Sequence, residues 1–136
     1  MKDKFFLNGN IILYAFGKDD SKKAIAKELI RQKLTISVQV INEVSNTLFK
    51  KFHFSVSETK NIFDFIKNKT EIKPMNIKTI EYCFYIKEKY KFSYWDSMII
   101  ASALENKCLI LFTEDMQNGQ IIEEHLVIVN PFLNNN

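Results

Sequence analysis

The sequence predicts an α/β fold, a three-layer sandwich with a mostly parallel central sheet of roughly five strands. Two observations lead to this prediction. Short apolar runs recur along the chain, and segments with the periodicity of amphipathic helices separate them. With 136 residues the chain has the length of one domain, which we expect to cover residues 1–133, with residues 134–136 as a frayed tail.

The first half of the chain supplies two of the expected strands. Residues 5–7 predict a buried strand, and the tight turn after it leads into a helix that Asn10 caps. A second helix begins at Asp20, and residues 34–38 predict the second strand. The following helix carries apolar residues at intervals of three and four positions: Ile41, Val44, Leu48 and Phe52.

The second half continues the alternation of helices and strands. Ser55 and Glu58 fit a capping box, which opens a helix. Residues 72–75 predict a short strand, and Pro74 places it at an edge of the sheet because proline cannot donate a backbone hydrogen bond. The remaining elements are a helix opened by Asn76, a helix opened by Ser93, and strands at 109–112 and 126–129.

The composition excludes several classes of protein. It is 46% hydrophobic and 26% charged, as in folded soluble proteins and unlike disordered chains. The longest apolar run, residues 11–16, is far shorter than the ~20 residues that span a bilayer. The N-terminus lacks a signal-peptide pattern, and the two cysteines fit a reducing compartment, so we expect a cytoplasmic protein without membrane contact.

Charge and motifs narrow the chemistry further. The net charge of +3 is too small to indicate a polyanionic partner by itself. His53 and His125 lack the spacing of zinc ligands, and the chain has no glycine-rich phosphate-binding motif. Zinc and nucleotide chemistry are therefore disfavoured.

Polar residues follow the ends of two predicted strands. Asn8 follows the first strand, and Thr113 and Asp115 follow the strand at 109–112. In a parallel sheet these carboxyl ends form the edge where ligands bind. Turn formation alone also explains Asn and Asp at such positions, so neither segment is decisive by itself.

Asp96 and Glu43 add two carboxylates near the same edge. Asp96 is the only charged residue in the apolar stretch from Tyr94 to Leu104, where a carboxylate is costly unless it is paired, hydrogen-bonded or bound to metal. Its place in the first turn of a helix capped by Ser93 explains it equally well. Periodicity alone predicts that Glu43 is at the surface, but it lies one turn beyond the second predicted strand.

Together these side chains predict a site for a hard divalent cation. Glu43, Asp96 and Asp115 would hold Mg²⁺, which prefers carboxylate oxygen and water, and Mn²⁺ is an expected substitute. A metal held in this way can activate water for hydrolysis of a phosphodiester. Asn8 occupies the position of a further ligand, and Thr113 is expected to orient a metal-bound water.

Segments along nearly the whole chain resemble, in order, the motifs of the PIN domain family. They are residues 6–15, 39–43, 93–103, 112–120 and the closing 129–132. The resemblance is greatest to the toxins of VapBC toxin–antitoxin pairs. It implies a five-stranded parallel sheet, Mg²⁺-dependent endoribonuclease activity, a homodimer and inhibition by a small VapB-type antitoxin. It also implies that RNA is the substrate.

The chain departs from the family pattern at one position, because Asn8 stands where the pattern has aspartate. The amide oxygen is a neutral ligand, so we expect this form to be inactivated or weakened while its fold survives. Deliberate inactivation of a toxic nuclease is the more economical interpretation, and a natural degenerate copy is the other. The alternative function is a catalytically silent PIN-like module that binds RNA or an antitoxin.

A basic and aromatic segment precedes Asp96. We predict that Lys87, Lys89, Tyr90 and Lys91 contact RNA, since lysines bind phosphates and aromatic rings stack on unpaired bases. A solvated helix end explains the same residues without RNA. Trp95, which follows this segment, is expected to pack in the core, as most aromatic residues do.

Overall fold

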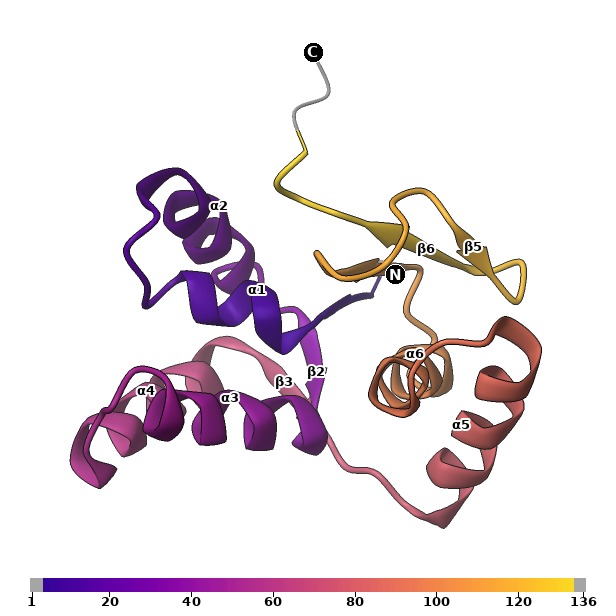
Figure 1. Ribbon diagram of the computed structural model, residues 1–136, viewed down its shortest axis with the longest axis horizontal. Helices are drawn as coiled ribbons and strands as arrows, with labels where there is room; N and C mark the ends of the chain where they lie inside the picture. The colour runs from indigo at the N-terminus through magenta and orange to yellow at the C-terminus, as the bar shows by residue number, and fades with distance from the viewer. Residues whose placement is uncertain (1–3, 134–136) are drawn as a thin grey trace.

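A six-stranded sheet organises the computed structural model, which describes residues 4–133 (Figure 1). The strand order is β3-β2-β1-β4-β6-β5, and all neighbours are parallel except β5 and β6. In chain order the elements are β1 (Phe5–Leu7), α1 (Gly9–Tyr14), α2 (Asp20–Ile30), β2 (Thr35–Ser37), α3 (Val38–Lys50), α4 (Val56–Lys69), β3 (Glu71–Lys73), α5 (Ile77–Tyr90), α6 (Tyr94–Glu105), β4 (Ile110–Phe112), β5 (Ile121–Ile122) and β6 (Leu126–Val129).

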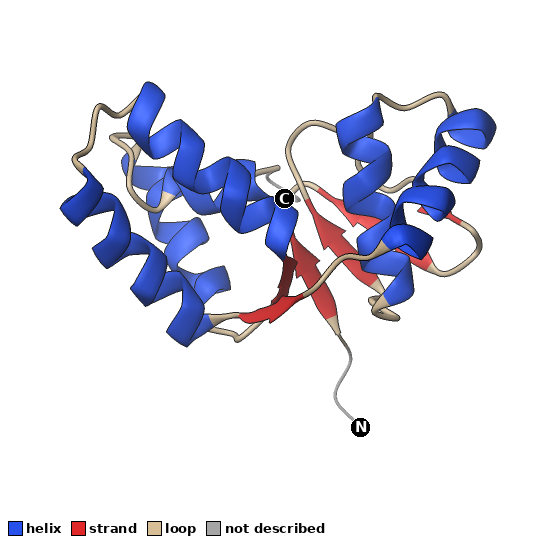
Figure 2. Ribbon diagram, turned by 90° about the horizontal axis from the view of Figure 1, so that it is seen from below, coloured by secondary structure: helices blue, strands red, loops and turns tan. Residues whose placement is uncertain are grey.

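The helices form two groups with the strands between them. Helices α1 to α4 lie on one side, and α5 and α6 pack together on the other (Figures 1 and 2). This arrangement confirms the predicted α/β sandwich with a mostly parallel sheet. The predicted frayed tail, 134–136, lies outside the described residues. Within residues 4–133, none of the helices has the length and apolar character needed to cross a bilayer.

All five predicted strands are present, and β5 is the addition. It contains only two residues and pairs antiparallel with β6. A segment this short offers no periodicity by which it could be recognised in the sequence. Pro74 follows β3, and β3 is an edge strand, as its neighbouring proline predicts.

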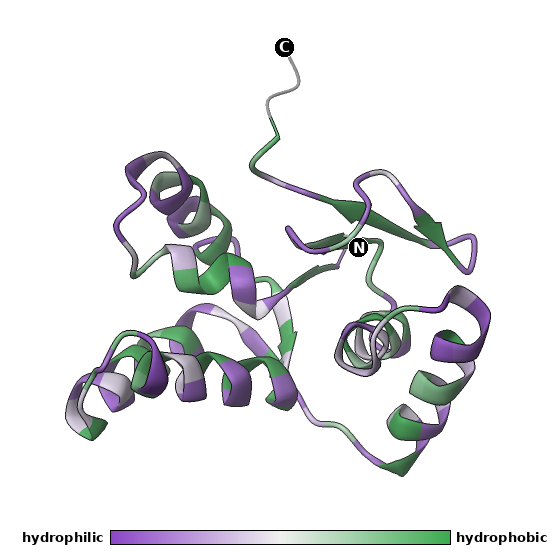
Figure 3. Ribbon diagram, viewed as in Figure 1, coloured by the Kyte–Doolittle hydropathy of each residue, from purple (hydrophilic) through white to green (hydrophobic). Residues whose placement is uncertain are grey.

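The core lies between the sheet and its helices. Phe6, Leu7, Ile36 and Leu111 of the central strands have no exposed surface, and neither do Ile122 and Ile128 at the other end of the sheet. In Figure 3, β5 and β6 are hydrophobic along most of their length, whereas α3 alternates hydrophobic and hydrophilic residues. The predicted apolar stripe of α3 faces inward, because Ile41, Val44 and Leu48 are buried.

Two of the expected helix caps are displaced by one or two residues. Asn8, not Asn10, is the N-cap of α1, and its side chain accepts a hydrogen bond from the Gly9 N–H at 2.7 Å. Asp19, not Asp20, caps α2. Asn, Asp and Ser are all good caps, so neighbouring candidates cannot be ranked from the sequence alone. The capping box of Ser55 forms as predicted.

Glu123 ties the β5–β6 turn to the end of α5. Its Oε2 lies 2.6 Å from Lys89 Nζ and accepts a hydrogen bond from the Tyr90 hydroxyl at 2.8 Å. The Glu123 N–H in turn donates to the Tyr90 hydroxyl at 2.9 Å. The pKa of Glu123 is lowered to about 2 from its usual 4.5, because its carboxylate accepts hydrogen bonds from Lys89, which has the largest effect, and from Tyr90.

The depressed pKa predicts a pH-dependent contribution to stability. The ionised Glu123 stabilises the folded state above pH 4.5, and this stabilisation is lost as the pH falls from 4.5 towards about 2. We therefore expect Glu123→Gln to lower the urea midpoint at pH 7 and to have a smaller effect at pH 3. Glu124→Gln, at the exposed neighbouring position, is the matched control. An equal loss at both pH values would contradict the prediction.

Candidate active site

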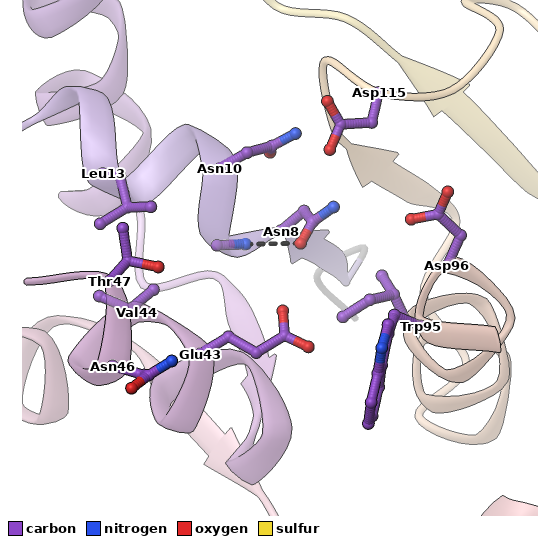
Figure 4. Close-up of a pocket in the computed structure, with 12 residues that line it drawn as sticks. Asn8, Asn10, Leu13, Glu43, Val44, Asn46, Thr47, Trp95, Asp96 and Asp115 are labelled. Atoms are coloured by element: carbon purple, nitrogen blue, oxygen red, sulfur yellow. Dashed lines mark hydrogen bonds between the residues drawn. The ribbon is translucent and has the colours of Figure 1, made fainter. Parts of the chain in front are cut away.

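The polar residues predicted at the carboxyl edge come together in one pocket. Asn8 follows β1, Asp115 follows β4, Glu43 lies on α3, and Asp96 lies in the first turn of α6. All four line a pocket of about 360 Å³. Figure 4 shows the carboxylates of Glu43, Asp96 and Asp115 directed towards the same space, with Asn8 between them.

Strand pairing and one close helix contact bring these segments together. Leu7 pairs with Phe112, so the residues that follow each strand lie side by side, and the Asn8 N–H donates to the Phe112 carbonyl at 3.0 Å. Helix α1 then approaches α3 closely at Gly9. A Cβ atom at that position would lie 3.1 Å from Val44 Cγ2, closer than ordinary contact. Because Gly9 has no side chain, α3 can pack closely against α1, and this places Glu43 in the same pocket as Asn8.

Thr113, the residue after β4, connects Asn8 and Asp115 by hydrogen bonds. It is fully buried, and its hydroxyl accepts hydrogen bonds from Asn8 Nδ2 at 3.0 Å and from the Asp115 N–H at 3.3 Å. Asn10 Nδ2 approaches the same oxygen at 3.4 Å. Thr113 does not line the pocket. The hydroxyl of Thr113 positions Asn8 and Asp115 through these hydrogen bonds, and its orientation of a metal-bound water stays a prediction.

A second network fixes the loop that carries Asp115. Glu114 accepts a hydrogen bond from the Tyr14 hydroxyl at 2.6 Å and forms an ion pair with Lys22 at 2.5 Å. The Lys22 ammonium also lies over the ring of Phe132, 5.1 Å from its centroid. Helices α1 and α2 thus hold the residue directly before Asp115.

The pocket concentrates negative charge. Partial burial raises the pKa of the Asp96 carboxyl, a hydrogen bond with the Ser93 side chain opposes this, and the charges of Asp115 and Glu43 raise it further. Glu43 accepts a hydrogen bond from Gln39 Nε2 at 2.7 Å. Over residues 4–133, none of the ion pairs includes Glu43, Asp96 or Asp115. Uncompensated carboxylates in a shared pocket favour binding of a cation.

The pocket offers carboxylate and amide oxygens, which suit a hard divalent cation. Within the described chain, no group of three His, Cys, Asp or Glu side chains is arranged to hold a metal ion directly. Mg²⁺ is commonly bound through one or two carboxylates and keeps several waters, whereas structural Zn²⁺ takes four protein ligands. Asn10 Oδ1, in the pocket lining, is buried and has no hydrogen-bond partner, so a further hard oxygen is available there.

The structure contradicts the prediction that Trp95 packs in the core. It is 56% exposed and lines the pocket beside Asp96. Helix α6 is largely apolar, but only its residues from Ser97 to Ala103 are buried, and its first turn lies at the carboxyl edge of the sheet. The rule that an apolar helix is buried fails in that turn.

The predicted RNA-binding segment lies outside the pocket lining. Lys89 and Tyr90 contact Glu123, and Lys87 Nζ donates to the Phe92 carbonyl at 3.1 Å. Lys91 ends α5 in a left-handed conformation with φ of 63°. Contact of these residues with RNA stays a prediction.

Sequence reasoning missed three polar residues of the pocket lining, Asn10, Asn46 and Thr47. Asn46 and Thr47 lie three and four positions after Glu43 on α3, the spacing that places side chains on one helix face. That spacing could have identified them. The sequence predicts Asn10 only as a cap, although it is the second residue of the helix that follows β1.

The structure is an α/β protein with an acidic pocket at the carboxyl edge of its sheet, and sequence comparison identifies its family. The PIN domain family model matches residues 5–118, so the chain belongs to the PIN domain family. No curated protein matches the sequence.

Solved structures share the fold at low sequence identity. A chain of a toxin–antitoxin complex from Klebsiella pneumoniae is 20% identical, with a TM-score of 0.70 over 95% of this chain and 98% of that chain. VapBC2 from Rickettsia felis, bound to a promoter DNA fragment, is 20% identical, with a TM-score of 0.69 over 93% and 98%. The sarcin–ricin-loop-cleaving toxin VapC20 of Mycobacterium tuberculosis is 13% identical, with a TM-score of 0.66 over 82% and 90%.

The hydrogen bonds of Thr113 predict a measurable structural role. Thr113→Val preserves shape but removes the acceptor of the buried Asn8 Nδ2. An unsatisfied buried donor costs about 1–3 kcal/mol, so we expect a loss of that size in urea unfolding. Thr113→Ser keeps the hydroxyl and should lose less. If the valine and serine variants were equally stable, the hydroxyl would have no positioning role.

Proposed function

We propose that the protein is a Mg²⁺-dependent endoribonuclease of the VapC type, the toxin of a toxin–antitoxin pair, weakened here by Asn8. The observation that carries the proposal is the shared pocket of Glu43, Asp96 and Asp115 at the carboxyl edge of the sheet. PIN domains are generally nucleases that use divalent metal ions, which supports the assignment. The proposal includes a cytoplasmic location, a homodimer and a VapB-type antitoxin as partner.

The pocket residues would act mainly by binding and orientation. Glu43, Asp96 and Asp115 would hold Mg²⁺ directly or through water, and Mn²⁺ would replace it. The bound metal supplies neutralisation of phosphate charge and a more acidic water. Thr113 and Glu114 position Asn8 and Asp115 from outside the pocket. The chain needs no protein nucleophile for this hydrolysis.

The groups around residue 8 can accommodate an aspartate as well as an asparagine. Asn8 Oδ1 accepts from the Gly9 N–H, and an Asp oxygen would accept the same bond. The Thr113 hydroxyl, which now accepts from Asn8 Nδ2, can rotate to donate to a carboxylate instead. The exchange therefore preserves both contacts and adds one negative charge to the pocket.

Asn8→Asp is expected to create or restore Mg²⁺-dependent cleavage of RNA. The measurement is incubation of the variant and the parent with total RNA, with Mg²⁺ and with EDTA. The double variant Asn8→Asp, Asp96→Asn keeps the restored residue and removes another carboxylate, so it should be inactive. RNA left intact by the single variant with both Mg²⁺ and Mn²⁺ would refute the catalytic assignment.

Metal binding should also be visible as a gain in stability without any substrate. A ligand at ten times its dissociation constant stabilises the folded state by about 1.4 kcal/mol. We expect Mg²⁺ to raise the unfolding temperature of Asn8→Asp more than that of the parent, because the added charge strengthens binding. The added Asp96→Asn substitution should abolish most of the shift. If Mg²⁺ raised the unfolding temperature of all three proteins equally, the metal would bind outside this pocket.

A catalytically silent module that binds RNA or an antitoxin is the second candidate. One observation favours it: both ends of the Asn8 amide are hydrogen-bonded, so asparagine fits the site as it stands. The codon in the natural gene separates the two candidates. Asparagine there supports the silent module, whereas aspartate supports an inactivated nuclease.

A further inference from the structure

Trp95 is an exposed aromatic side chain at the rim of an acidic pocket. It is the only tryptophan in the chain, and more than half of its surface, 56%, is exposed. Its indole contacts the ring of Tyr94 edge to face, with centroids 5.0 Å apart. Figure 4 shows the indole beside the pocket, with Glu43 facing it from α3. An exposed indole beside a polar pocket offers a flat face on which a nucleic-acid base can stack.

A second hollow adjoins the pocket further along α1 and α3. This hollow has a volume of about 340 Å³, and Lys18, Lys51 and Phe52 belong to its lining. Both hollows share Asn10, Leu13 and Thr47, so they form one groove. We call it the α1–α3 groove; it runs from Trp95 and Asp96 to Lys18 and Lys51.

Charge and chemistry change along the α1–α3 groove. The carboxylates and Trp95 lie at one end and uncharged amide and hydroxyl groups in the middle. Lys18 and Lys51, with Asp19 as the single acidic residue among them, lie at the other end. A single nucleic-acid strand offers matching groups, because its phosphates suit the lysines and its unpaired bases have flat faces that stack on indole. Paired bases inside a duplex have no free face to stack.

We propose that Trp95 is a stacking platform for an unpaired base of single-stranded RNA, whose backbone follows the α1–α3 groove to Lys18 and Lys51. The inference rests on the proposed function and names its substrate class as unpaired RNA. Trp95 then positions the phosphodiester next to the base over the acidic pocket. It is a positioning residue that contacts the base and takes no part in proton transfer.

The sole tryptophan makes the proposal directly measurable in the parent chain. A short unstructured RNA oligonucleotide, titrated in Mg²⁺, should quench the intrinsic tryptophan fluorescence, because stacking places a base on Trp95. The same oligonucleotide annealed to its complement should bind more weakly and quench less. Gel analysis after the titration checks that the RNA is intact.

Substitutions separate stacking from general apolar contact. Measured by anisotropy of a labelled oligonucleotide, Trp95→Leu should weaken binding about tenfold, whereas Trp95→Phe should retain most of it. Phe49→Leu, at an exposed phenylalanine of α3 outside both hollows, is the matched control and should change nothing. Lys18→Ala and Lys51→Ala should each weaken binding and flatten its salt dependence.

The outcomes distinguish this inference from the proposed function. Unquenched fluorescence on RNA binding, with unchanged affinity in Trp95→Leu, overturns the inference, and cleavage by Asn8→Asp would leave the nuclease assignment intact. Quenching and weakened binding without any cleavage by Asn8→Asp support the platform and refute the nuclease. If Trp95→Leu instead dissociates a dimer and binds RNA normally, Trp95 belongs to a subunit contact and the proposal is wrong.

Discussion

Parallel pairing of β1 with β4 is the constraint on which the site depends. These strands lie far apart in the sequence, yet their register places Leu7 beside Phe112. The hydrogen bond from Asn8 to Thr113, which joins residues 105 positions apart, follows directly from that register. A shift of the register by one residue would turn these side chains to the opposite face and separate them. The acidic pocket is therefore a product of the sheet rather than of any local motif.

The pocket also illustrates a conflict between stability and binding. Asp96 is partly buried and is repelled by Asp115 and Glu43, so its charged form is unfavourable in the folded state. Elsewhere in the described chain, carboxylates such as Glu114 and Glu123 are paired with lysines and have lowered pKa values. The contrast separates carboxylates that stabilise the fold from those that a bound cation would have to neutralise.

Sequence periodicity was sufficient for the fold because most elements are long or strongly apolar. The stripe of α3 and the capping box of Ser55 are local patterns, and the structure contains both. The sequence also predicted that Asn8 and Asp115 lie at one edge, because the carboxyl ends of parallel strands share an edge of the sheet. Exposure could not be predicted in the same way. Trp95 lies in an apolar helix, and its exposure depends on which neighbouring helices reach the first turn.

Position 8 shows why a fold can be insensitive to a change that decides activity. Asn8 is buried and is the N-cap of α1, so a poor cap or a larger residue would disturb the fold. Asn and Asp have nearly the same shape, and both accept the Gly9 N–H. The Thr113 hydroxyl can serve as acceptor for one and as donor for the other. Packing and hydrogen bonding therefore barely distinguish the two residues, and what differs is the charge presented to a cation in the pocket.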